Sequence, residues 1–155
     1  MDEWRFFCLI TSRVPVFEQP SLAHIALTLL QHTLAQHGAQ LWGYVILPDS
    51  VQAVLETEHE AAYHHAIEAF KTASETAICE KIRADHPDLV DAITFYNPAW
   101  SKPVYLIWQG GYQTQLLPSA YALSNKIADL VQRPVELGLA ATPADWPFSS
   151  YQPPE

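Results

Sequence analysis

Two small polar residues interrupt an apolar stretch, and their spacing places both side chains at one site. In LWGYVILPDSVQAVLE at residues 41–56, Ser50 and Gln52 are separated by a single valine. The apolar run before them ends at Pro48-Asp49, which is typical of a tight turn, so the stretch predicts a strand, a turn and a returning strand. Because side chains alternate along a strand, Ser50 and Gln52 share one face, opposite to that valine.

A second group of candidate residues lies in a predicted helix near the C-terminus. Lys126, Asp129 and Arg133 are spaced at i, i+3 and i+7, so they share one helix face. One interpretation is an ion-pair stripe on a partly solvated surface, worth roughly a few tenths of a kcal/mol per pair. The other is an anion site, in which Arg133, with Lys126 nearby, holds a phosphate without any metal.

Histidine and tyrosine give weaker signals for chemistry. None of the seven histidines has the i, i+4 spacing that directs two imidazoles at one ion, so we interpret them as solvated side chains. Tyr112 and Tyr121 are candidate nucleophiles, but the sequence places no base or metal beside either. We expect Tyr112 to pack. Tyr121 precedes Asp129 by about 12 Å of helix and does not share its position.

Further basic and aromatic residues are candidates for binding an anion or DNA. Arg5, Arg13 and Lys71 are scattered cations that could add to a basic face. Trp100, beside Lys102, is the tryptophan that we expect to be exposed and free to stack on an unpaired base.

Composition limits the classes of function. The chain has 155 residues, 49% of them apolar, and a formal net charge of −9 from 17 acidic and 8 basic side chains. This predicts one folded domain whose surface repels polyanions on average, so a nucleic-acid site needs a local basic patch. Cys8 and Cys79 are expected to be buried thiols of a cytoplasmic protein. The acidic start and its short apolar run predict no signal peptide and no membrane span.

The elements that must position these residues follow from hydrophobic periodicity. The pattern predicts strands and helices in the order β-α-β-β-α-β(β)-α. Strands that pair as hairpins, with helices covering one face, make an antiparallel α+β sandwich of ferredoxin-like type. In chain order we expect a strand at 4–12, a helix from Ser21 to Gly38, the hairpin 41–56, a helix at 58–86, strands at 104–108 and 112–117, a helix that Pro134 breaks, and a tail that packs Trp146, Phe148 and Tyr151 onto the body.

Three segments together resemble the single-tyrosine HUH transposases, in particular the REP-associated tyrosine transposases. They are GYVILPDSVQAVL, IWQGGYQTQLL and RPVELGLAATPADWPFSSY. Members of that family carry Tyr-Val-Met-Pro-Asn-His-x-His, then Trp-Gln-x-Gly-Tyr, and end in Asp-Trp-Pro-Trp-Ser-Ser-Tyr. The resemblance implies one transposase-like domain over residues 1–155 with the HUH fold, in which about 84–103 looks like an insertion.

The family's chemistry explains why Ser50 and Gln52 share a strand face. In the family, two histidines on that strand bind Mg²⁺ or Mn²⁺, and a helix tyrosine attacks a DNA phosphate to form a 5′-phosphotyrosine link. The histidines correspond to Ser50 and Gln52, the tyrosine to Asp129, and a helix amide that completes the metal shell to Arg133. Hydroxyl and amide oxygens are poor replacements for imidazole, and a permanent cation repels a metal ion.

We therefore expect a catalytically inactive member of the family, with no catalytic residue, no metal and no cofactor. Two present roles remain open. The chain binds single-stranded or hairpin DNA weakly, or it is a protein-interaction or structural module with an unknown protein partner and no DNA role. The resemblance favours a monomer.

Overall fold

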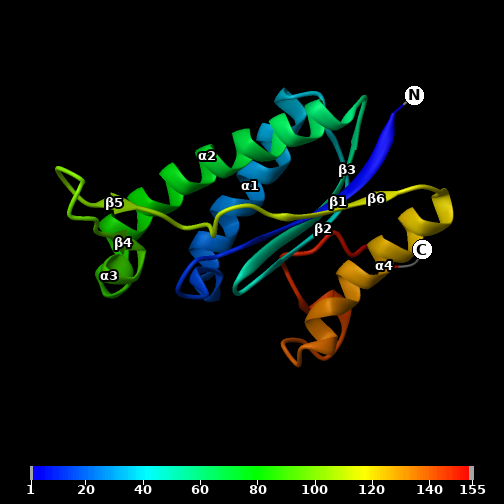
Figure 1. Cartoon of the computed structure of the whole chain (residues 1–155). Coiled ribbons are helices and arrows are strands. Elements are labelled where there is room, and N and C mark those ends of the chain that lie inside the picture. Colours follow the sequence, from blue (N-terminus) through cyan, green and yellow to red (C-terminus); the bar gives the residue numbers. More distant parts are fainter. Residues whose placement is uncertain (1, 154–155) are drawn as a thin grey trace.

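A four-stranded antiparallel sheet forms the centre of the molecule, in the order β2-β3-β1-β6 (Figure 1). The computed structural model describes residues 2–153. The four strands are β1 (Glu3–Ile10), β2 (Gln40–Leu47), β3 (Ser50–Thr57) and β6 (Gln113–Leu117). The internal position of β1 matches its continuous apolar run, since a strand buried on both faces has no need of alternation.

The predicted hairpin is confirmed and sets the position of Ser50 and Gln52. Strands β2 and β3 pair antiparallel, with Leu47 opposite Ser50 across the turn. A register shift between Leu41 and Gly43 marks a bulge in β2. In β1, the residues opposite Ser50 and Gln52 are Ile10 and Cys8.

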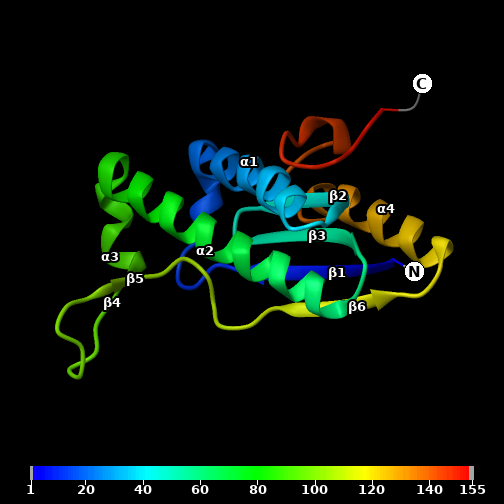
Figure 2. The same ribbon diagram turned by 90° about the horizontal axis from the view of Figure 1, so that it is seen from above.

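Helices α1 (Pro20–Gln36) and α2 (Glu60–Asp85) pack against each other and cover one face of the sheet, here called the closed face (Figure 2). Phe7 and Leu9 of β1 point into this core and are fully buried. Helix α1 begins at Pro20, one residue before the predicted start at Ser21, because proline suits the first helical position. His59 caps α2 by accepting a hydrogen bond from the Ala62 amide at 3.1 Å.

Helix α4 (Ala120–Glu136) lies on the opposite face, here called the α4 face (Figure 1). The α+β class and the antiparallel sheet are confirmed, but the helices cover both faces instead of one. The reason is that β1 and its neighbours carry apolar side chains on both sides, and Leu123 and Leu130 of α4 pack on the second set. Pro134 does not break the helix; it lies inside the last turn, which continues to Glu136.

Residues between α2 and β6 form a small separate unit at the far end of α2 (Figure 1). A short 3-10 helix (Pro87–Leu89) and α3 (Val90–Ile93) lead into a two-stranded sheet of β4 (Thr94–Phe95) and β5 (Val104–Tyr105). The loop between β4 and β5 projects from the body. This segment covers most of the predicted insertion.

The C-terminal tail adds to the free edge of β2. Phe148 accepts a hydrogen bond from the Ile46 amide at 2.8 Å, and Ser150 donates its amide to Tyr44 at 3.0 Å. The Trp146 indole donates to the Ile46 carbonyl at 3.0 Å. The tail thus covers an edge that would otherwise expose unpaired backbone groups.

Candidate nucleic-acid interface

Ser50 and Gln52 lie together on the α4 face, as their spacing predicts. Ser50 is buried and Gln52 is half-buried. The Gln52 amide donates a hydrogen bond to Ser50 Oγ at 3.3 Å, so part of the hydrogen-bonding capacity of this pair is used internally. In the sheet register Gln52 is opposite Cys8, and Cys8 is opposite Gln113, which gives a row of small and polar side chains across three strands.

Helix α4 brings Lys126 and Arg133 over this row. The Lys126 ammonium lies 3.9 Å from the centre of the Phe6 ring, close enough for a cation–π interaction. Arg133 Nη1 is 3.2 Å from Glu136 Oε2, and its side chain remains 43% exposed, so the guanidinium can still bind another anion. Asp129 is exposed, and within residues 2–153 no ion pair joins it to Lys126 or Arg133.

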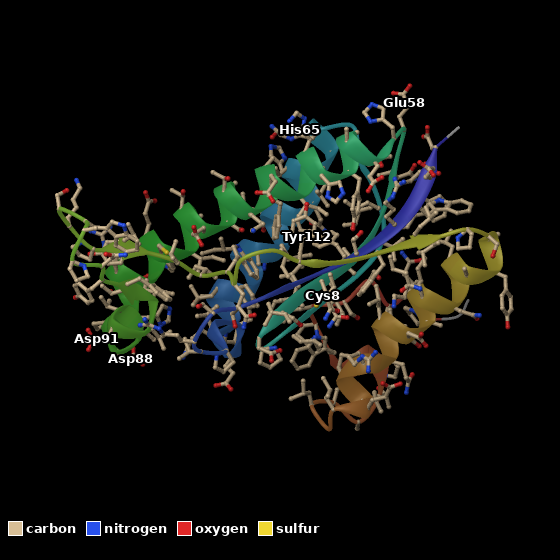
Figure 3. The ribbon with its side chains drawn as sticks, viewed as in Figure 1. Cys8, Glu58, His65, Asp88, Asp91 and Tyr112 are labelled. Atoms are coloured by element: carbon tan, nitrogen blue, oxygen red, sulfur yellow. The ribbon has the colours of Figure 1, made fainter. Side chains whose placement is uncertain are left out.

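Lys126 and Arg133 are both close enough to Cys8 to affect the pKa of its thiol. Burial, and to a smaller extent Asp49, raise the pKa of the Cys8 thiol, whereas Lys126 and Arg133 lower it, and the net pKa is about 11. Figure 3 shows Cys8 on the side of the sheet that faces α4. A hollow of about 250 Å³ opens beside it, lined also by Ile10, Gln113 and the Gly110-Gly111 turn.

These residues do not fit a divalent metal ion. The Ser50 hydroxyl is buried and accepts a hydrogen bond from Gln52, and Arg133, at the position that the sequence resemblance assigns to the third ligand, carries a guanidinium. In the described part of the chain, no three His, Cys, Asp or Glu side chains are arranged to hold an ion. The donor set instead suits a hydrogen-bonded anion, because Arg133 and Lys126 supply charge without a metal.

Arg5 does not belong to this face, contrary to the expectation of a shared basic patch. Alternation along β1 directs it to the closed face, where it is 8% exposed. Its Nη2 is 3.0 Å from Glu3 Oε1 and its guanidinium lies 5.7 Å from the Tyr63 ring centre. Among residues 2–153, its Nη1 has no hydrogen-bond partner. Arg5 is therefore a buried structural cation.

Arg13, Lys71 and Trp100 make their contacts with residues other than Lys126 and Arg133. Arg13 donates to the Thr94 carbonyl at 3.0 Å and stacks on Phe95 at 3.8 Å, which ties the β4–β5 unit to the body. Lys71 lies 5.7 Å from the Tyr112 ring centre, on the α2 side. Trp100, in the β4–β5 loop, is 44% exposed, as expected. The basic candidates that converge are Lys126 and Arg133.

A base beside Tyr112 is the feature that the sequence did not reveal. Tyr112 Oη is 2.6 Å from His64 Nδ1, and His64 Nε2 is 3.4 Å from Glu60 Oε1. Burial raises the pKa of Tyr112, and Glu68 raises it further, which disfavours the phenolate that a nucleophile needs. Figure 3 shows Tyr112 on the α2 side. The i, i+4 spacing of Glu60 and His64 could have predicted their contact from the sequence, but the contact of His64 with Tyr112 depends on the fold.

None of the helices in the described part of the chain combines the length and apolar character that crossing a membrane requires. No protein-family model matches the sequence. A search of curated proteins also gives no match.

Two solved structures are similar to this chain. One is a REP-associated tyrosine transposase bound to a REP hairpin, with a TM-score of 0.66 and 15% identity, covering 96% of this chain and 76% of that one. The other is a candidate transposase from Deinococcus radiodurans R1, with a TM-score of 0.52 and 19% identity, covering 90% of this chain and 93% of that one. The resemblance in the sequence is thus confirmed at the level of structure: this chain has the α+β fold of the REP-associated tyrosine transposases.

Proposed function

We propose that this chain is a transposase-like protein that binds single-stranded or hairpin DNA without cutting it. The observation that carries the proposal is the position of two cations of α4: Lys126 lies 3.9 Å from the ring centre of Phe6, which packs in the same cluster as Cys8, and the Arg133 side chain remains 43% exposed. Two cations face the place where the family implies a metal. They hold a backbone phosphate directly, through charge-assisted hydrogen bonds.

The residues at the other family positions cannot support cleavage. Asp129 replaces the attacking phenol with a carboxylate, which is repelled by a phosphodiester of like charge. Ser50 and Gln52 are hydrogen-bonded to each other and are poor metal ligands. No Mg²⁺ or Mn²⁺ is therefore used, and the protein is not an enzyme.

DNA binding is weak and only modestly dependent on salt. Two phosphate contacts give a slope of log affinity against log salt of only about −1.4 on a single strand. The net charge of −9 further opposes association. The transposase bound to a REP hairpin supports a hairpin as the DNA form to test.

A protein partner is the second candidate, and the β4–β5 loop favours it. Tyr96 is 75% exposed and Trp100 44% exposed at this projecting loop. Exposed aromatic side chains of this kind are typical of protein interfaces. In this alternative the acidic surface carries no cost, because no polyanion is bound. The chain acts as a monomer in either role.

A gel-shift assay with a hairpin oligonucleotide carrying a single-stranded tail tests the proposal. We expect retention at 50 mM salt, binding about 7-fold weaker at 200 mM, and no nicking with Mg²⁺ or Mn²⁺. The double variant Lys126→Ala/Arg133→Ala should abolish retention. Lys81→Ala/Arg83→Ala is the matched control, since it removes the same charge from α2. Equal loss in both variants, or no retention of the wild type at 50 mM salt, would favour the protein partner.

A further inference from the structure

A second groove lies on the other flank of α4, between the edge strand β2 and the C-terminal tail. Its volume is about 750 Å³, in the range of pockets that bind small molecules. The main lining residues are Gln31 of α1, Trp42, Gly43 and Tyr44 of β2, and Tyr151 and Gln152 of the tail.

Gly43 and the bulge beside it shape this groove. A Cβ on Gly43 would lie 3.0 Å from Ile127 Cγ1, which is tighter than an ordinary contact, so glycine lets α4 approach β2 without displacing Ile127. The register shift at Gly43 accompanies an outward Trp42, which is 41% exposed and packs edge-to-face on Trp4 at 6.1 Å. The bulge therefore presents an aromatic ring at the rim of the groove.

The tail supplies the opposite wall and is fixed to β2. Ser150 Oγ accepts a hydrogen bond from the Tyr44 amide at 2.9 Å and donates to the Tyr44 carbonyl at 3.2 Å. An isolated bridge joins Val45 to Ser149. These bonds hold Tyr151 and Gln152 where they line the groove.

The chemistry of the lining points to a flat, neutral ligand with hydrogen-bonding edges. Trp42, Tyr44 and Tyr151 offer ring faces, and Gln31 and Gln152 offer amide donors and acceptors. No charged side chain is among the lining residues, all of which lie within residues 2–153. A phosphate would lack a cation here, and a purely apolar helix would leave the Gln152 amide unpaired.

We propose that this groove binds an unpaired nucleobase of the DNA strand whose phosphate is held on the other flank of α4. The inference rests on the proposed function and names the part of the DNA that is read. Lys126 lies over Phe6 of β1, whereas Ile127 meets Gly43 of β2, so adjacent residues of one helix reach both flanks. The base stacks on Trp42, and the two glutamine amides bind its edge.

Two hairpins that differ only in one tail nucleotide test the proposal. In one, the unpaired tail carries its bases; in the other, one tail position is abasic. Stacking of a base on an aromatic residue is worth roughly 5- to 150-fold in affinity, so wild type should prefer the intact tail by a factor in that range. Trp42→Ala should remove this preference. Trp100→Ala is the control, because Trp100 is similarly exposed but lies in the β4–β5 loop.

Gln31→Ala is a second variant that leaves the fold intact, since Gln31 is exposed on α1. It should reduce the preference for the intact tail by a smaller factor than Trp42→Ala. If wild type binds both hairpins equally, the nucleobase site is wrong, although the phosphate site and the proposed function stand. If neither hairpin is retained at 50 mM salt, the proposed function fails.

Free deoxyadenosine separates those two failures without any phosphate. At millimolar concentration it should shift the NMR signals of the Trp42 indole and the Gln31 and Gln152 side-chain amides, and leave the Trp100 indole unchanged. Absence of these shifts overturns the nucleobase site even if the hairpins bind.

Discussion

The two faces of the sheet are built for different purposes. On the closed face, α1 and α2 bury a large apolar core around Phe7, Leu9 and Tyr63. On the α4 face, one helix covers a smaller cluster around Phe6, Cys8 and Val45. The closed face holds Arg5, which is paired with Glu3, out of water, whereas the α4 face leaves Arg133 partly exposed.

Because of this difference, the closed face mainly stabilises the fold, and the α4 face is available for binding. The closed face supplies most of the apolar burial, which is the main favourable contribution to folding. The α4 face can therefore carry polar, exposed side chains and two grooves without unfolding the chain. None of the four positions that the sequence resemblance assigns to the family's catalytic centre, Ser50, Gln52, Asp129 and Arg133, contributes to the closed core, so these positions can vary without unfolding the chain.

Matched leucine truncations give the largest expected contrast between the faces. Leu30 of α1 is fully buried and Leu123 of α4 is 6% exposed. Leucine-to-alanine changes cost about 2–5 kcal/mol, depending on how well the site collapses. We expect Leu30→Ala near the upper end and Leu123→Ala near the lower end, measured by urea unfolding. Equal losses would show that the two faces stabilise the fold to the same extent.

Alkaline pH should weaken the closed face through Tyr63. Burial raises the pKa of Tyr63 to about 12, from about 10 in the unfolded chain. The folded state then binds the proton more tightly, so the free energy of unfolding falls as pH rises from about 10 to about 12. The loss reaches about 2–3 kcal/mol, at 1.36 kcal/mol per pKa unit.

Tyr63→Phe provides the reference for that measurement. It lacks the phenol that donates to the Phe6 carbonyl at 2.8 Å, so its unfolding free energy is lower at pH 8 but falls less steeply above pH 10. The two buried thiols titrate in both proteins, and the difference between the curves isolates Tyr63. Parallel curves for the two proteins would refute the assignment.

Much of this contrast could be predicted from the sequence, but the placement of α4 could not. The alternation in β3 correctly put Ser50 and Gln52 on one face, and the spacing in α4 correctly grouped Lys126 with Arg133. Periodicity identifies the apolar side of a helix, yet it does not say which face of the sheet that side meets. The run Phe6-Phe7-Cys8-Leu9 was the signal that both faces are covered.

Features that join distant parts of the chain were beyond the reach of local patterns. The groove between β2 and the C-terminal tail combines Gln31, Trp42 and Tyr151, and the Tyr112–His64 contact spans 48 residues. Alternation along β1 would have excluded Arg5 from the patch, since it shares the face of Phe7. Pairing within a sheet can be inferred from sequence, whereas the walls of a groove depend on where loops and tails pack on the rest of the fold.

Gly43 tests how tightly α4 is seated on the sheet. Gly43→Val places new atoms within contact of Ile127 and should cost about 1–3 kcal/mol through overpacking. Adding Ile127→Ala should restore part of this loss, because it removes the atoms that clash. Urea unfolding of the two single variants and the double variant gives the coupling. Additive costs would mean that α4 moves freely over β2.

The smallest expected effect is the cation–π pair on the α4 face. Lys126 lies 3.9 Å from the Phe6 ring centre, whereas on the α2 side Lys71 lies 5.7 Å from that of Tyr112. A double-mutant cycle with Lys126→Met and Phe6→Leu should give a coupling of about 0.5–1 kcal/mol. The equivalent cycle with Lys71→Met and Tyr112→Leu should give less, because the electrostatic attraction weakens with distance.

Salt dependence distinguishes the origin of this coupling, since screening weakens attraction between a cation and an exposed ring more than apolar packing. The Lys126–Phe6 coupling should survive 0.5 M salt, because Phe6 is buried and Lys126 is half-buried. If the coupling disappears at 0.5 M salt, the attraction between the Lys126 ammonium and the Phe6 ring is fully screened by solvent ions. Lys126 would then be free to leave Phe6 for a phosphate, and its contribution to DNA binding would cost no folding energy.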